Sequence, residues 1–203
     1  MGSLEEINMP QNGIRSAGMI AVAEAVAGNP ELKVLNLNDN TFGKDGCGAM
    51  ATAFASCTKL EQLNLGDCLL RSAGFEAIGA ALAGNANLKV IDLTYNELKE
   101  ANLETLMKVL TGRVQLEKLD INGNVFSEAS IEAVAACITD NGGQPADVVL
   151  GDVDEMEDPD DEDDEDEDED GEDSEDSDAD DGGGSEDEEG AADVADLLKN
   201  LAM

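Results

Sequence analysis

The chain has 203 residues and a formal net charge of −37, with 48 acidic residues against 11 basic ones and no histidine. This balance argues against direct binding to nucleic acid, which needs Lys and Arg to neutralise phosphates, and it favours a basic partner. The absence of histidine removes the usual catalytic triads and His-bearing zinc sites, and the four cysteines show no CxxC spacing, so we expect no metal, no other cofactor and reduced thiols. We also expect no signal peptide and no membrane span, because no window reaches the roughly 18 apolar residues that a span needs.

Five short segments with alternating apolar residues predict five half-buried strands. Each segment begins with a leucine, and successive leucines are 28 residues apart, at Leu4, Leu32, Leu60, Leu88 and Leu116. An asparagine or a cysteine follows each segment, at Asn12, Asn40, Cys68, Asn96 and Asn124. This is the leucine-rich repeat pattern L-x-x-L-x-L-x-x-N/C. A buried amide at this position can satisfy backbone groups of neighbouring turns, and we interpret Cys68 as a small, weakly donating substitute.

The second half of each unit predicts a helix. Ser16 and Ser72 are N-cap candidates, and Gly28 and Gly84 lie where a left-handed C-cap residue is expected. Inward-facing positions recur at the same 28-residue interval, and we interpret them as core. The two large columns are Val22, Met50, Ile78, Leu106, Val134 and Val26, Phe54, Leu82, Leu110, Ile138; a smaller column is Ala25, Ala53, Ala81, Val109, Cys137.

Strand, turn and helix repeated with right-handed crossovers predict an α/β leucine-rich repeat solenoid, or horseshoe, of five 28-residue strand–helix repeats in residues 1–150. A short closing strand is expected at 148–150. Nothing ahead of Leu4 reads as a cap, so we expect large apolar side chains of the first unit to stay exposed, at about 1.5–3 kcal/mol each. We therefore expect a longer horseshoe of which this chain is the C-terminal part, or a first unit that meets another chain.

Two further segments follow the repeats. Residues 151–190 carry 27 acidic residues and no basic one, which predicts a disordered acidic tract. The tract is interpreted either as a solubilising tail or as an electrostatic attractant for basic proteins. Residues 191–203 form a short amphipathic segment, in which Val194, Leu197, Leu201 and Met203 have the spacing of a nuclear export signal; a weakly packing helix is the alternative.

Several phrases go beyond the generic repeat pattern: MPQNGIRSAG at 9–18, LNLNDNTF at 35–42, GDCLLRSAG at 66–74, and LDINGNVFSE followed by an acidic tract. With them, residues 4–203 resemble the C-terminal half of the leucine-rich repeat domain, plus acidic tail, of the Ran GTPase-activating protein family. The resemblance implies a regulator of the small GTPase Ran, not itself an enzyme. It would stimulate GTP hydrolysis in support of nucleocytoplasmic transport, in the cytoplasm and at the nuclear envelope, with shuttling through the nucleus.

The resemblance also bears on the site. The arginine and asparagine credited with activation in that family belong to earlier repeats and match no position here, so we expect no catalytic residue and an accessory binding role. The turns after the strands form a ridge that offers a surface for the GTPase, with the alternative that these are solvated turn residues. The partner-binding candidates are Gln11, Asp39, Asp67, Arg71 and Tyr95. Arg71 shares the repeat register of Arg15, which favours a structural role for it.

Two alternatives remain open. The concave column Asn8, Asn36, Asn64, Asp92 and Asp120 is a second candidate surface. An acidic leucine-rich chaperone of histones or other basic proteins is the alternative function, although such proteins use shorter repeats than 28 residues. A binder similar to ribonuclease inhibitor has repeats of similar length but is cysteine-rich and lacks an acidic tract.

Overall fold

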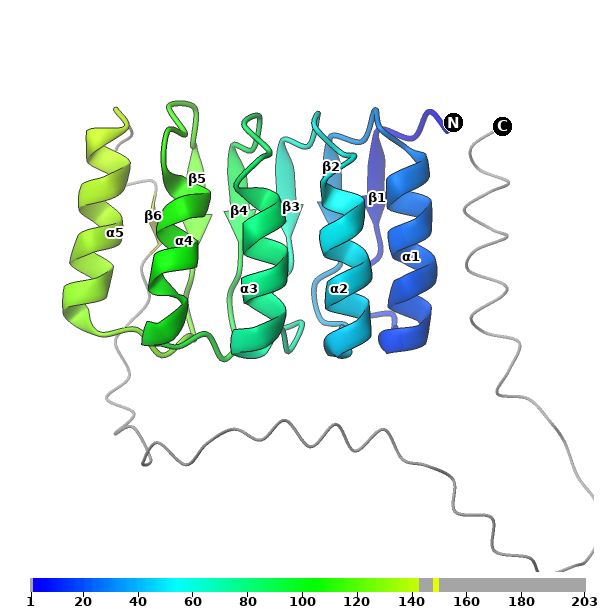
Figure 1. Ribbon diagram of the computed structural model, residues 1–203, viewed down its shortest axis with the longest axis horizontal. Coiled ribbons are helices and arrows are strands. Elements are labelled where there is room, and N and C mark those ends of the chain that lie inside the picture. The colour runs from blue at the N-terminus through cyan, green and yellow to red at the C-terminus, as the bar shows by residue number, and fades with distance from the viewer. Residues whose placement is uncertain (1, 143–147, 150–203) are drawn as a thin grey trace, which may run out of the picture.

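A computed structural model of the chain describes residues 2–142 and 148–149 (Figure 1). The acidic tract and the export-like residues Val194, Leu197, Leu201 and Met203 lie outside the described residues. Within the described part, strands and helices form two layers, with the helices side by side over one face of the sheet (Figure 1).

The sheet has six parallel strands in chain order. They are β1 (Glu6–Asn8), β2 (Val34–Asn36), β3 (Gln62–Asn64), β4 (Val90–Asp92), β5 (Lys118–Asp120) and β6 (Val148–Val149). The first five strands pair with the register that the 28-residue interval predicts: Ile7, Leu35, Leu63, Ile91 and Leu119 are successive partners. The expected closing strand is present as β6, which pairs with β5.

A helical segment follows each of the first five strands. The segments are α1 (Ser16–Gly28), α2 (Gly43–Phe54), α3 (Arg71–Leu82), a 3₁₀ turn η1 (Glu100–Asn102) that runs into α4 (Leu103–Leu110), and α5 (Glu128–Asp140). Each helix lies beside the helix of the next unit, so the helical layer follows the order of the strands (Figure 1). No helix in the described ranges is both long enough and apolar enough to cross a membrane.

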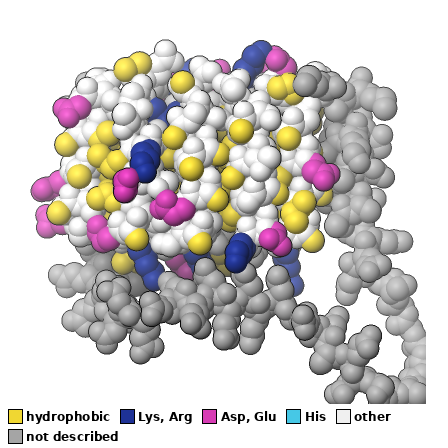
Figure 2. Space-filling view, in the orientation of Figure 1, with side chains coloured by type: hydrophobic (Ala, Val, Ile, Leu, Met, Phe, Trp, Pro, Cys, Tyr) yellow, Lys and Arg dark blue, Asp and Glu magenta, His cyan; other side chains and the backbone are white. Residues whose placement is uncertain are grey.

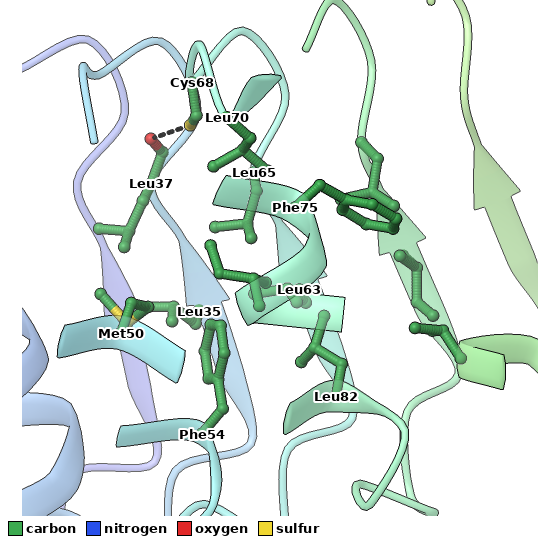
Figure 3. Packing of buried hydrophobic residues seen from close by; sticks show 14 of the residues in the cluster. Leu35, Leu37, Met50, Phe54, Leu63, Leu65, Cys68, Leu70, Phe75 and Leu82 are labelled. Atoms are coloured by element: carbon green, nitrogen blue, oxygen red, sulfur yellow. Dashed lines mark hydrogen bonds between the residues drawn. The ribbon is translucent and has the colours of Figure 1, made fainter. Parts of the chain in front are cut away.

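The core lies between the two layers and confirms the predicted inward columns. Every member of the two large columns is buried, as are the central residues of β1 to β5. Figure 3 shows Met50 and Phe54 from α2 and Phe75 and Leu82 from α3 among the leucines of β2 and β3 and of the residues that follow them. In the small column Ala53 and Val109 are buried, whereas Ala25, Ala81 and Cys137 are half-buried.

The predicted helix caps are wrong. Ser16 is the first residue of α1 and Ser72 the second residue of α3, and the residues before these helices make no side-chain cap. Neither Gly28 nor Gly84 has a positive φ; Asn29, which follows α1, has φ −120° and ψ 74°, and Ala83, which follows α3, keeps right-handed helical backbone. A side-chain cap occurs instead at Ser127, whose hydroxyl accepts from the Ser130 amide at the start of α5.

The expected exposure of the first unit is confirmed only in part. Ile7, Met19, Val22 and Val26 are buried, whereas Leu4 and Met9 are half-buried although their counterparts in the second unit, Leu32 and Leu37, have no exposed surface. The buried residues belong to the same core cluster as Leu35 and Met50 of the second unit. In addition, the Leu4 amide donates to Asn29 Oδ1 at 3.0 Å and the Gly2 amide to the Gly28 carbonyl at 2.8 Å, so the preceding segment runs across the end of α1.

Candidate functional site

The turns that follow the strands are held by a ladder of buried side chains. Asn96 has no exposed surface; its Nδ2 donates to the Leu65 carbonyl at 2.7 Å, and its Oδ1 accepts from the amides of Cys68 and Leu70 at 3.1 and 3.2 Å. Asn40 makes the equivalent bonds, from its Nδ2 to the Met9 carbonyl and to its Oδ1 from the Asn12 and Ile14 amides. Each amide therefore joins two neighbouring repeats, as the sequence predicts.

Cys68 occupies the third position of this ladder. Its thiol donates to the Leu37 carbonyl at 3.2 Å, the bond drawn in Figure 3, so the predicted substitution by a weak donor is confirmed. Burial raises the pKa of the Cys68 thiol to about 12, although hydrogen bonds from the backbone of Asn40 and Asp39 lower it. Burial also raises the pKa values of Cys47 and Cys57 to about 11. These thiols serve packing, because a thiol with so high a pKa is a poor nucleophile.

A second ladder, which our sequence analysis missed, lies at the helix C-termini. Its members recur every 28 residues: Asn29, Cys57, Asn85, Arg113 and Asn141. Asn85 Nδ2 donates to the Cys57 carbonyl at 3.0 Å, and Arg113 donates to the carbonyls of Asn85, Leu82 and Val109. Burial lowers the pKa of Arg113, and its donors meet carbonyls at the end of α3, where the helix dipole favours a cation. The sequence does contain a signal for this ladder, because asparagine and cysteine recur here every 28 residues, as they do in the first ladder.

Four of the five partner-binding candidates form a row in the turns just after the C-terminal ends of the strands. We call this row the ridge. Its members, Gln11, Asp39, Asp67 and Tyr95, have φ values of 55°, 56°, 52° and 53°. Each backbone amide donates to a carbonyl of the next turn, at 2.7–2.9 Å. Such left-handed backbone is uncommon outside glycine, and here it turns the side chains outward at regular intervals.

Within the ridge, Gln11 Nε2 donates to Asp39 Oδ2 at 2.7 Å. Asp39 is half-buried, whereas Asp67 and Tyr95 are exposed. The acidic side chains thus stand in two adjacent turns, where they can attract a basic partner surface.

Arg71, the fifth candidate, lies beside the ridge. Its Nε is 3.4 Å from Glu97 Oε2, and both side chains are exposed. Although Arg71 and Arg15 share a repeat register, their backbones differ: Arg71 has a φ of +53° and opens α3, while Arg15 is extended ahead of α1. Both side chains are nevertheless exposed at the start of a helix, so a shared structural role at the surface stays a prediction.

Side chains of the concave column mostly stabilise their own turns. Asn36, Asn64 and Asp92 each accept from the amide two residues onward, at 2.9–3.1 Å, and Asn36 Nδ2 donates to Asn8 Oδ1 at 2.9 Å. These bonds use one side-chain oxygen in each of the three residues. The column therefore has less free hydrogen-bonding capacity than its composition suggests.

Near the start of the strands, side chains at one register alternate in charge: Glu5, Lys33, Glu61, Lys89 and Glu117. Lys33 Nζ lies 3.0 Å from Glu5, and Lys89 Nζ lies 2.7 Å from Glu61. The hydrogen bond and charge of Lys89 lower the pKa of Glu61. These pairs bridge neighbouring repeats and balance each other, so this end of the sheet offers a partner little net charge.

The described residues offer little for other types of site. No group of three or more Cys, Asp or Glu side chains there could hold a metal ion. A groove of about 380 Å³ lies between α2 and α3 and is lined by Lys44, Cys47, Leu69, Leu70, Arg71 and small residues. On the helix face shown in Figure 2, charged side chains are scattered rather than gathered into one patch.

Comparison with known proteins supports the class of fold. A leucine-rich repeat family model matches residues 28–51. This match, together with the parallel sheet and the helices on one face, fits a leucine-rich repeat fold. No curated protein matches the chain. Leucine-rich repeat domains generally mediate protein binding.

Proposed function

We propose that this chain is a leucine-rich repeat solenoid of five units that binds a Ran-type small GTPase and supports the stimulation of its GTP hydrolysis in nucleocytoplasmic transport. One observation carries the proposal: Gln11, Asp39, Asp67 and Tyr95 are held outward at one register by left-handed backbone in four successive turns. The phrases MPQNGIRSAG, LNLNDNTF and GDCLLRSAG support the choice of GTPase.

The proposed role is binding rather than chemistry. Activation of a GTPase requires groups that position the attacking water or stabilise charge on the γ-phosphate. The arginine and asparagine to which the resemblance assigns activation match no position in this chain. Arg71 forms an ion pair with Glu97. We therefore assign the ridge to recognition of a basic surface on the GTPase, with a cytoplasmic location that includes the nuclear envelope.

Binding to the GTP-loaded GTPase, measured by calorimetry, tests the proposal. The double variant Asp39→Asn/Asp67→Asn removes two ridge charges and should weaken binding about tenfold, mainly through slower association. The control Glu24→Gln/Glu132→Gln removes the same charge from exposed positions on α1 and α5 and should bind like the unaltered chain. Absence of binding by the unaltered chain would overturn the proposal.

Single-turnover hydrolysis separates binding from activation. We expect no acceleration by this chain, and acceleration by a chain that carries further repeats ahead of Leu4. Equal acceleration by both would contradict the assignment of the chemistry to other repeats.

A second candidate function rests on the 27 acidic residues of 151–190. An acidic chaperone would bind histones or other basic proteins through this tract. Removing residues 151–203 should then abolish binding to purified core histones while leaving binding to the GTPase. Loss of both on the same truncation would favour the chaperone and count against the ridge.

A further inference from the structure

Exposed apolar side chains gather on the ridge edge. Within the described residues five large hydrophobic side chains are exposed, and three of them lie in the turns after β3, β4 and β5: Leu69 at 39%, Tyr95 at 62% and Val125 at 37%. Single exposed apolar residues need no explanation, but three in successive turns of one edge indicate an interaction surface. We call these three residues the apolar edge.

Tyr95 is the fixed point of this edge. Its amide donates to the Asn122 carbonyl at 2.9 Å, and its ring crosses to the next turn, over Gly123. A Cβ atom at Gly123 would overlap Tyr95 Cδ1 and Cε1, so a side chain there would displace the ring. Glycine at this register therefore makes room for the ring of Tyr95. A ring that is held before binding loses little rotational freedom when a partner packs against it.

The turn after β3 is strained in a way that exposes Leu69. Three alternate residues, Asp67, Leu69 and Arg71, have φ values of 52°, 50° and 53°. Left-handed backbone is costly for a leucine and persists where the surroundings impose it. Here Asn96 imposes it, because its Oδ1 accepts from the amides on both sides of Leu69 and its carbonyl accepts from the Arg71 amide. Leu69 is thereby turned toward solvent, where it borders the groove between α2 and α3.

Charge around the apolar edge selects a cationic partner group. Asp67 lies one turn before Tyr95 and is exposed, whereas Glu97, two residues after Tyr95, is already paired with Arg71, whose Nε lies 3.4 Å from Glu97 Oε2. The aromatic face attracts a cation, and arginine combines a flat, weakly hydrated guanidinium with donors for a carboxylate. An arginine on the ring of Tyr95 could bond to Asp67 while its partner's apolar side chains cover Leu69 and Val125.

We infer that Tyr95 is the anchor of the interface, and that an arginine side chain of the GTPase stacks on its ring and bonds to the carboxylate of Asp67. This inference rests on the proposed function, of which it names the central contact. It also predicts that the interface is centred on the third to fifth turns rather than on Gln11 and Asp39.

Tyr95 is the sole tyrosine of the chain, and there is no tryptophan. Incorporation of 3-fluorotyrosine therefore gives a single ¹⁹F resonance that reports on this ring alone. We expect the GTP-loaded GTPase to shift or broaden it. We expect Tyr95→Leu, which keeps apolar area but removes the ring, to weaken binding at least tenfold. Tyr95→Phe should stay within threefold, and the control Val114→Ala, at the most exposed hydrophobic residue outside the ridge edge, should bind normally.

A cross-linking measurement identifies the partner group. With p-azidophenylalanine at position 95, the cross-linked GTPase peptide should contain an arginine at the attachment site, and its change to alanine should remove the effect of Tyr95→Leu. Normal binding by Tyr95→Leu, an unmoved ¹⁹F resonance, or a cross-link remote from any arginine would overturn the inference and leave the proposed function standing. Failure of the unaltered chain to bind the GTPase would overturn both.

Discussion

The ladder residue Asn96 offers the sharpest test of how the repeats are joined. The Asn96→Ala substitution removes four hydrogen bonds, two of them accepted from the buried Cys68 and Leu70 amides and one donated to the buried Leu65 carbonyl. A buried polar group that loses its partner costs about 1–3 kcal/mol. Three such groups belong to the preceding repeat, and water entering the space left by the amide recovers part of the loss. We therefore expect the free energy of unfolding to fall by about 4 kcal/mol.

The chain contains its own control for this substitution. Asn12 has the same repeat register, but it is exposed and its Nδ2 donates only to the nearby Pro10 carbonyl at 2.9 Å. Asn12→Ala should therefore change the free energy of unfolding by less than about 0.5 kcal/mol. Asn96→Cys should fall between the two, because Cys68 shows that a thiol at this register can donate to the preceding repeat.

Urea denaturation followed by far-ultraviolet circular dichroism measures these differences as shifts in midpoint at constant m value. Hydrogen exchange adds a local measurement, since the amides of Cys68 and Leu70 should lose protection in Asn96→Ala. A loss below about 1 kcal/mol, or an equal loss in Asn12→Ala, would refute the claim that the buried amide joins the repeats.

Three more outcomes follow from the structure. Arg113→Leu should lower the free energy of unfolding by about 3 kcal/mol in urea titrations, because three carbonyls lose their donor, and Arg113→Asn should cost less, since asparagine fills this register elsewhere. At pH 8 iodoacetamide should modify Cys137 before Cys68, as judged by peptide mass spectrometry. A pKa of about 12 leaves only roughly one thiolate in 10⁴ at Cys68, and Cys137 is less buried than Cys68. Burial alone would raise the pKa of Glu100, but hydrogen bonds from Ser130 and Ser127 outweigh burial and lower this pKa. The contribution of the Glu100 carboxylate to stability is therefore complete above the ordinary pKa of a glutamate, and it is lost as the pH falls through the lowered pKa of the folded protein. Glu100→Gln should accordingly reduce the difference in urea midpoint between pH 6 and pH 3, and an unchanged difference would contradict this role.

The periodic part of the fold was predictable because it depends on local spacing. Leucines 28 residues apart specify strands that pair one repeat apart, and the inward columns specify which helix faces pack on them. The role of Asn40 and Asn96 was predictable for the same reason, since a buried amide at every strand end has only turn backbone to bond with. The closing strand β6 followed from its short apolar run after the last helix.

The helix caps and the first unit were not predictable from such spacing. A serine ahead of an apolar run is only a candidate cap, and the path of the preceding turn placed Ser16 and Ser72 inside their helices. Likewise, residues before β1 reach the end of α1 through Asn29, a contact over 25 residues that no local pattern encodes.

By itself, the sequence determined the repeat length, the strand register, the core columns and the ladder of amides, because each of these repeats along the chain. Only the tertiary structure decided how the exposed turns are shaped. The left-handed backbone at Leu69 depends on Asn96 of the next repeat, and the position of the Tyr95 ring depends on the absence of a side chain at Gly123. Both are contacts between residues 26 to 28 positions apart, so the surface proposed for partner binding exists only once neighbouring repeats have stacked.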